Sequence, residues 1–173
     1  MQVKNLTFAK MPAGTARPLY TPEQRRRRDS SRWTLVQGIL APIQFLILLV
    51  SVVLVVRYLV TGEGSGVAAA SVVIKTCALY AIMITGSIWE KVVFGKWLFA
   101  EAFFWEDVFS MLVLALHTAY LITLAFGIGT ERGRMILALA AYASYAINAT
   151  QFLLKLRAAR LQGSMGSALA VTQ

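Results

Sequence analysis

The sequence has few of the residues on which most water-soluble enzymes depend. Its 173 positions include one cysteine, one histidine and 14% charged residues, whereas soluble domains carry roughly 25% charged residues. The single cysteine, Cys77, excludes an intrachain disulfide and argues against a cysteine-based metal cluster. The sequence contains no phosphate-binding glycine loop and no Ser-His-Asp order. These absences exclude a soluble enzyme, a disulfide scaffold and a disordered chain.

Long apolar runs occupy most of the chain, in which 58% of residues are hydrophobic. A membrane-spanning helix needs about 20 apolar residues. Four segments qualify and are joined by short links, which makes consecutive helices antiparallel neighbours. We therefore predict an all-α fold, an integral membrane bundle of four transmembrane helices in the domain 33–156, with spans at about 33–60, 67–89, 103–126 and 135–156. Segments 1–32 and 157–173 are predicted to be a basic N-terminal tail and a C-terminal tail.

The link 90–102 differs from the other two links because aromatic residues alternate with Lys and Glu. Such a mixture suits the headgroup layer, where rings have an apolar body and lysine reaches toward water. An interfacial segment and a plain connecting loop are both compatible with this pattern.

The basic residues indicate how the chain lies in the membrane. The net charge is +9, from 17 Lys and Arg against 8 Asp and Glu. The two tails and the link 90–102 together hold 13 of the basic residues, and the other two links with their flanks hold 3. The positive-inside rule then places both termini in the cytoplasm. The run Arg25–Arg28 fits this topology signal better than a nucleic-acid site or an export signal, so we expect no nucleic-acid partner.

Polar residues inside the spans are the candidate functional groups, because each is costly to place in lipid. Helical periodicity puts Glu106, Ser110 and His117 on one face of the third span, with Asp107 on its flank. A second stripe contains Thr76, Tyr80, Met83, Ser87 and Glu90. Glu90 ends at the same depth as Glu106, so carboxylates should meet at the cytoplasmic mouth. In the fourth span, Asn148, Gln151 and Lys155 share a face.

Each of these residues also has a structural interpretation. Asn148 and Gln151 suit hydrogen bonds between packed helices. Glu90 and Asp107 could be solvated carboxylates paired with nearby lysines. His117 could be a packing residue, a metal ligand or a proton carrier. Trp89 and Trp105 could anchor the interface or stack on a planar ligand. Lys75 is expected to reach outward or to pair with a backbone carbonyl.

Four stretches of the sequence resemble the bacteriochlorophyllide 3-vinyl hydratase family, also called 2-vinyl bacteriochlorophyllide hydratase. They are LYTPEQR at 19–25 with WTLVQG at 33–38, TGSIWEK at 85–91 with VFG at 93–95, FFWEDVFSM at 103–111 with LHTAY at 116–120, and Asn148 with QFLLKLRAAR at 151–160. The third stretch is the most specific, since Trp-Glu-Asp at the start of a span is unusual. The resemblance implies hydration of the 3-vinyl group of chlorophyllide a or 3-vinyl bacteriochlorophyllide a in bacteriochlorophyll biosynthesis.

Chemical reasoning then assigns roles to the candidate residues. We predict that Glu106 is the acid that protonates the vinyl group, kept protonated by partial burial and by the like charges of Glu90 and Asp107. Asp107 or Glu90 would orient the water. His117 would bind the Mg²⁺ carried by the substrate or relay a proton, and no other cofactor is expected. The substrate would lie among Trp89, Trp105, Phe109, Tyr80, Ser110, Asn148 and Gln151.

The resemblance also implies a place and partners for the protein. The membrane would be the bacterial cytoplasmic or intracytoplasmic photosynthetic membrane. The lipid bilayer, other pigment-biosynthesis enzymes and a second copy of the chain are the expected partners. From the residues alone, a small proton-coupled transporter and a non-catalytic pigment-binding assembly protein are the alternatives. A pore is disfavoured, because the polar residues gather in the cytoplasmic half.

Overall fold

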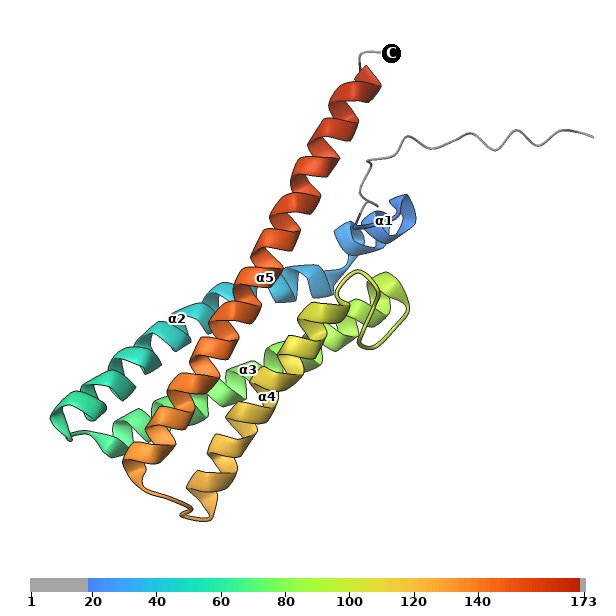
Figure 1. The fold of residues 1–173 in the computed structure, drawn as a ribbon. Helices are drawn as coiled ribbons and strands as arrows, with labels where there is room; N and C mark the ends of the chain where they lie inside the picture. The colour runs from blue at the N-terminus through green and yellow to red at the C-terminus, as the bar shows by residue number, and fades with distance from the viewer. Residues whose placement is uncertain (1–18, 172–173) are drawn as a thin grey trace, which may run out of the picture.

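The computed structural model describes residues 19–171, with side chains as far as Leu161, and the described chain is entirely helical (Figure 1). The first 18 residues of the predicted basic N-terminal tail lie outside this range. The helices are α1 (Pro22–Ser30), α2 (Arg32–Thr61), α3 (Ser65–Phe94), α4 (Phe104–Ala125) and α5 (Glu131–Val171).

Four of these helices are long and apolar enough to cross a membrane: α2, α3, α4 and the part of α5 from Glu131 to Leu161. Only 22–28% of the residues in their most apolar windows are buried within the protein. The outward faces carry large apolar side chains such as Leu46, Val53 and Ile84, which are more than 60% exposed. An apolar surface of this extent suits lipid and would aggregate in water.

Two helices extend beyond the predicted spans. The last turn of α3 includes Glu90–Phe94, which we had predicted as the start of a link, and the helix ends where Gly95 takes a left-handed φ of 80°. Helix α5 begins at Glu131, before the predicted 135, and the segment predicted as a C-terminal tail continues this helix through Val171. Both segments carry charged residues, which lower the hydropathy used to find span ends but do not interrupt a helix.

The basic segment before α2 is also partly helical. Helix α1 starts with a capping box, in which Thr21 and Gln24 satisfy each other's backbone N–H groups. Tyr20 anchors this segment by stacking on Phe94 and packing against Phe103. Burial raises the pKa of the Tyr20 hydroxyl, and the Arg28 guanidinium lies 4.7 Å from the centre of its ring.

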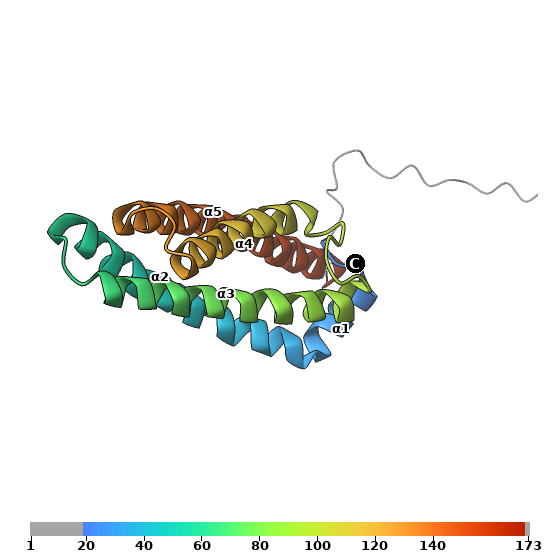
Figure 2. The same ribbon diagram turned by 90° about the horizontal axis from the view of Figure 1, so that it is seen from below.

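The long helices form two hairpins that lie in two layers (Figure 2). Helix α2 packs along α3, and α4 packs along α5, whereas α3 and α4 touch each other much less. A core that includes Val55, Val72, Tyr120 and Ala138 joins the layers toward the 62–64 and 126–130 turns. Ser51 hydrogen-bonds to both Ser71 and Tyr142, so α2, α3 and α5 meet at one buried polar junction.

The close packing of α5 against this core gives a stability prediction. Ala138 is fully buried in the core, whereas Ala140 is exposed on the same helix. Ala138→Leu should overpack the core and destabilise the protein by about 1–3 kcal/mol. Ala140→Leu is the matched control and should leave the melting temperature in detergent nearly unchanged. Equal melting temperatures for the two variants would contradict this packing.

Candidate active site

The predicted stripe Glu106, Ser110 and His117 lies on one face of α4, and that face packs against α5. Lys155 Nζ lies 2.6 Å from Glu106 Oε2, and Asn148 Nδ2 donates a hydrogen bond of 2.8 Å to Ser110 Oγ. The His117 ring lies 5.8 Å from that of Tyr142, centre to centre. These contacts form a seam of paired polar residues between α4 and α5, which we call the α4–α5 seam.

The ion pair with Lys155 changes the surroundings that we predicted for Glu106. Glu106 is 8% exposed, and the ammonium group also lies over the Phe103 ring at 5.2 Å. We had predicted that like-charged neighbours would hold a proton on Glu106. The structure places a cationic partner beside this carboxylate as well, and the role of Glu106 as the acid stays a prediction.

His117 is fully buried within the α4–α5 seam. Its Nδ1–H donates to the Val113 carbonyl at 2.8 Å, and Nε2 has no partner among the described residues. Neither the role of magnesium ligand nor that of proton relay has a route to an open surface in this arrangement. Lys75 is likewise fully buried, with Nζ 3.6 Å from the centre of the Tyr145 ring. The expectation that Lys75 reaches outward or pairs with a carbonyl was wrong, because an aromatic face receives the amine instead.

Glu90 of α3 and Asp107 of α4 form a buried carboxyl pair. Their carboxyl groups interact with each other, and the two residues are 3% and 7% exposed. The backbone N–H of Ala100 donates to Glu90 Oε1 at 2.9 Å, and that of Phe99 donates to Asp107 Oδ2 at 2.8 Å. Two buried carboxyl groups that interact repel each other when both are ionised, which favours a proton on one of them. The carboxyl pair is therefore the acidic group here that is built to hold a proton.

The connection between α3 and α4 is shaped by these backbone hydrogen bonds. Phe99 adopts a φ of 58°, a left-handed conformation that costs a bulky residue about 1–3 kcal/mol. The conformation presents two successive N–H groups, those of Phe99 and Ala100, to the carboxyl pair. The predicted link is thus a cap over two acidic side chains, which neither of its sequence interpretations included.

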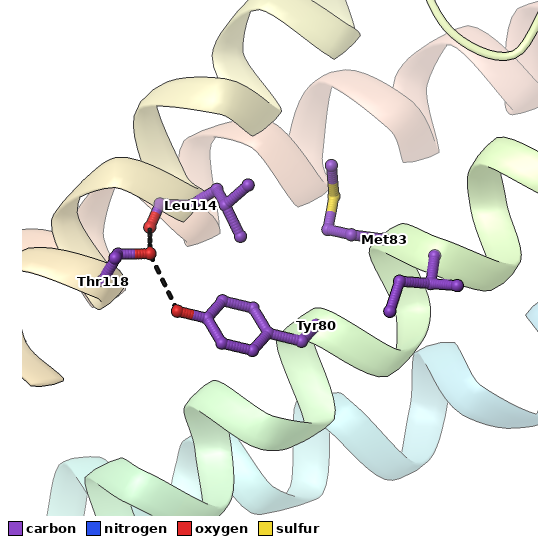
Figure 3. A pocket seen from close by; sticks show the side chains of 5 residues that line it. Tyr80, Met83, Leu114 and Thr118 are labelled. Carbon is purple, nitrogen blue, oxygen red and sulfur yellow. Dashed lines mark hydrogen bonds between the residues drawn. The ribbon is translucent and has the colours of Figure 1, made fainter.

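An apolar groove lies between α3 and α4 (Figure 3). It has a volume of about 310 Å³ and is lined by Tyr80, Met83, Ile84, Leu114 and Thr118. The Tyr80 hydroxyl and Thr118 Oγ1 lie 2.8 Å apart and join the two helices across it. Ile84 is 63% exposed, so the groove opens on the surface that would face lipid. We call it the α3–α4 groove.

The groove and the carboxyl pair lie between the same two antiparallel helices. Tyr80 precedes Glu90 by ten residues on α3, and Thr118 follows Asp107 by eleven on α4. At 1.5 Å per residue the two cross-helix pairs are roughly 15 Å apart along the helices. The carboxyl pair thus marks one end of the space between α3 and α4, and the hydroxyl pair Tyr80–Thr118 marks the other.

The remaining predicted site residues lie elsewhere. Trp89 packs against Phe94 and Phe103, and its Nε1–H donates to Thr34 Oγ1 at 2.9 Å. Trp105 is 68% exposed and touches Phe104 edge-on. Phe109 is half-buried. Asn148 belongs to the α4–α5 seam, and Gln151 lines a shallow depression of about 360 Å³ on α5.

The sequence analysis identified Tyr80 as a site residue but not Ile84, Leu114 or Thr118. One signal was available for α4. Leu114 and Thr118 follow Asp107 by seven and eleven residues, a spacing that returns to the same face of a helix. Neither residue is costly to place in lipid, so the criterion that singled out polar residues costly to bury there does not identify them.

These features define a class of protein: a helical protein with four candidate membrane spans, an apolar groove between α3 and α4, and a buried pair of acids between the same two helices. The chain belongs to the 2-vinyl bacteriochlorophyllide hydratase family, whose model matches residues 20–158. It is similar to the 2-vinyl bacteriochlorophyllide hydratase of Cereibacter sphaeroides, with 65% identity over 87% of this chain and 93% of the relative. The protein of that name from Rhodobacter capsulatus is 64% identical over 84% of this chain and 85% of the relative. No solved structure matches the chain. The family resemblance found in the sequence is confirmed.

The ion pair between Glu106 and Lys155 gives a second prediction. Lys155→Met should leave a buried carboxylate without its partner and destabilise the protein by about 1–3 kcal/mol. Glu106→Gln in the same chain should recover much of that loss, because the amide carries no charge. Arg157→Gln, at an exposed position of α5, is the control. Melting temperatures in detergent are measured for wild type, the two single substitutions, the double substitution and the control, and additive losses from the two single substitutions would show that the residues act independently.

Proposed function

We propose that the α3–α4 groove with its carboxyl pair is the active site at which this chain hydrates the 3-vinyl group of chlorophyllide a or 3-vinyl bacteriochlorophyllide a. Membership of the hydratase family, with about two thirds of residues identical to two hydratases over most of the chain, carries the activity. As a member of that family, the chain is a hydro-lyase of bacteriochlorophyll biosynthesis. The composition also allowed a transporter or a non-catalytic pigment carrier, and membership of the family favours the hydratase over both.

The reaction requires one proton and one water. A proton from the carboxyl pair adds to the terminal carbon of the vinyl group, and positive charge develops on the carbon next to the ring, where the macrocycle delocalises it. Water adds to that carbon and loses a proton to the carboxylate left behind. The product is the 3-(1-hydroxyethyl) derivative, and the carboxyl pair is restored to its starting state.

Three features of the carboxyl pair support this assignment over Glu106. Its two buried carboxyl groups interact, and the repulsion between two carboxylates favours a proton on one of them. The N–H groups of Phe99 and Ala100 hold both acids in place before the substrate arrives, which lowers the cost of organising the transition state. The neighbouring Glu106 is paired with Lys155, so its negative charge is already compensated beside the carboxyl pair.

The groove suits a flat apolar ligand. Its walls are the side chains of Met83, Ile84 and Leu114, and its open side faces lipid, from which such a ligand could enter. In this proposal these residues replace Trp89 and Trp105 as the walls of the macrocycle site. Ser110, Asn148 and His117 serve the α4–α5 seam, which keeps α4 in position. The Mg²⁺ travels with the substrate.

We further propose that the carboxyl pair lies at the cytoplasmic end of the bundle, with both termini in the cytoplasm and the helices in a bacterial cytoplasmic or intracytoplasmic membrane. The distribution of Lys and Arg supports this orientation. It also brings water to the acid, since the cap formed by residues 95–103 would lie at the interface. The 1–32 segment, the bundle 33–156 and the 157–173 segment are the corresponding parts of the chain.

The orientation predicts the accessibility of introduced cysteines. In a Cys77→Ala background, Glu63→Cys lies in the turn between α2 and α3, and Lys96→Cys lies in the cap, and both positions are exposed. In intact spheroplasts a membrane-impermeant maleimide should label Glu63→Cys, and it should label Lys96→Cys only after permeabilisation. The opposite pattern would reverse the topology.

The activity and the acid can be tested together. Purified protein in detergent, incubated anaerobically with chlorophyllide a and without added cofactor, should give a product heavier by one water. Glu90→Gln and Asp107→Asn keep the oxygen that accepts the loop N–H but remove the acid, so each should lower kcat by about 10²–10⁴-fold. Pigment binding, followed by fluorescence, should persist in both.

Glu106→Gln is the matched control for this experiment. It removes a neighbouring carboxylate that is not part of the carboxyl pair, so it should lower kcat far less than the other two substitutions. A wild-type protein that binds pigment without mass change would refute the hydratase proposal. Loss of turnover in Glu106→Gln alone would return the role of acid to Glu106.

A further inference from the structure

The Tyr80 and Thr118 hydroxyl groups of the α3–α4 groove form a hydrogen bond that plays no part in the proposed chemistry. Tyr80 and Thr118 are the groove-lining residues with polar side chains; the other three are apolar (Figure 3). Thr118 Oγ1 lies 2.7 Å from the Leu114 carbonyl and 2.8 Å from the Tyr80 hydroxyl. A buried carbonyl cannot donate, so Thr118 gives its single proton to Leu114. Tyr80 is then the donor in the hydroxyl pair.

This order of donors makes the Tyr80 hydroxyl exchangeable. If Tyr80 turned its proton to a ligand in the groove, Thr118 would still donate to Leu114, and no donor would be left unsatisfied. The exchange would therefore avoid the cost of an unpaired buried donor. Among the side chains that line the groove, the structure offers one hydrogen bond to a ligand, and it comes from Tyr80.

The position of Tyr80 relative to the carboxyl pair restricts which part of a ligand it can meet. The two lie roughly 15 Å apart along α3, a separation that matches the long axis of a tetrapyrrole with its substituents. A vinyl group placed at the carboxyl pair puts the opposite edge of the macrocycle near Tyr80. In chlorophyllides that edge carries the ketone of the fifth, carbocyclic ring, which is a hydrogen-bond acceptor and is fixed rigidly to the macrocycle.

We propose that Tyr80 donates a hydrogen bond to this ring ketone and so determines the direction in which the substrate lies in the groove. The inference rests on the proposed function, because it assumes that the vinyl group lies at the carboxyl pair. Tyr80 is then a specificity-determining residue. A macrocycle turned end for end would present no acceptor to Tyr80 and would place its vinyl group far from the acid.

The test compares Tyr80→Phe with wild type. The substitution keeps the ring and removes the donor, so the dissociation constant for chlorophyllide a, measured by fluorescence titration, should rise roughly three- to tenfold. The value of kcat at saturation should fall only by the fraction of pigment that then binds in the reverse, unproductive direction. Tyr58→Phe, outside the groove, is the matched control and should change neither quantity; its hydroxyl donates to Glu131.

Two further measurements make the assignment specific. Thr118→Val removes the resting partner of Tyr80 and frees the donor, so this variant should bind chlorophyllide a more tightly than wild type. A chlorophyllide whose ring ketone has been reduced to a methylene should bind wild type more weakly than chlorophyllide a does, and Tyr80→Phe should bind both pigments alike. Melting temperatures confirm that each variant is folded.

The possible failures are distinguishable. If Tyr80→Phe lowers kcat and leaves the dissociation constant unchanged, Tyr80 acts at the vinyl group and the proposed direction is overturned. Unchanged binding and unchanged kcat also overturn the proposal. If wild type binds pigment but forms no hydrated product, the proposed function fails, while the ratio of dissociation constants still decides whether Tyr80 contacts the ketone.

Discussion

Every polar group placed between helices in lipid must find its partner inside the protein, and this constraint organises the bundle. Water is not there to satisfy an unpaired donor or carboxylate, so each polar side chain draws another helix toward it. Helix α4 shows the consequence on two adjacent faces. Glu106, Ser110 and His117 face α5, and Asp107 and Thr118 face α3. The face of α4 toward α5 stabilises the fold, and the face toward α3 lines the groove.

The two faces differ in how their polar groups are spaced. On the α5 side, polar contacts recur along the helix, and the packing between α4 and α5 is continuous. On the α3 side, cross-helix polar contacts occur at the two ends, and the middle is apolar and open. A seam that packs continuously leaves no space for a ligand. A gap that is fixed at both ends and apolar between them offers a defined length and a hydrophobic surface, which is what a flat pigment requires.

Much of the fold was readable from the sequence, and the limits of the reading have a physical origin. Apolar runs located four helices, since span length follows from bilayer thickness. Helical periodicity placed Glu106, Ser110 and His117 on one face, but periodicity gives a direction around a helix and does not say which neighbour lies there. The residues most costly in lipid were therefore taken as the site, although their cost was met by α5. Leu114 and Thr118 cost little, and only the position of α3 reveals that they line a groove.

A hydration reaction on an apolar pigment must bring together a substrate that prefers lipid and a water molecule that avoids it. The placement of the carboxyl pair answers this requirement. The groove lies between the same two helices on the apolar side of the carboxyl pair, and the Phe99 and Ala100 N–H groups of the cap contact the pair at the end of the bundle. A single acid there would be left as a bare carboxylate once it had given up its proton. Two acids held by the N–H groups of Phe99 and Ala100 stay in place when the proton leaves, and the repulsion between the two carboxylates then favours its return.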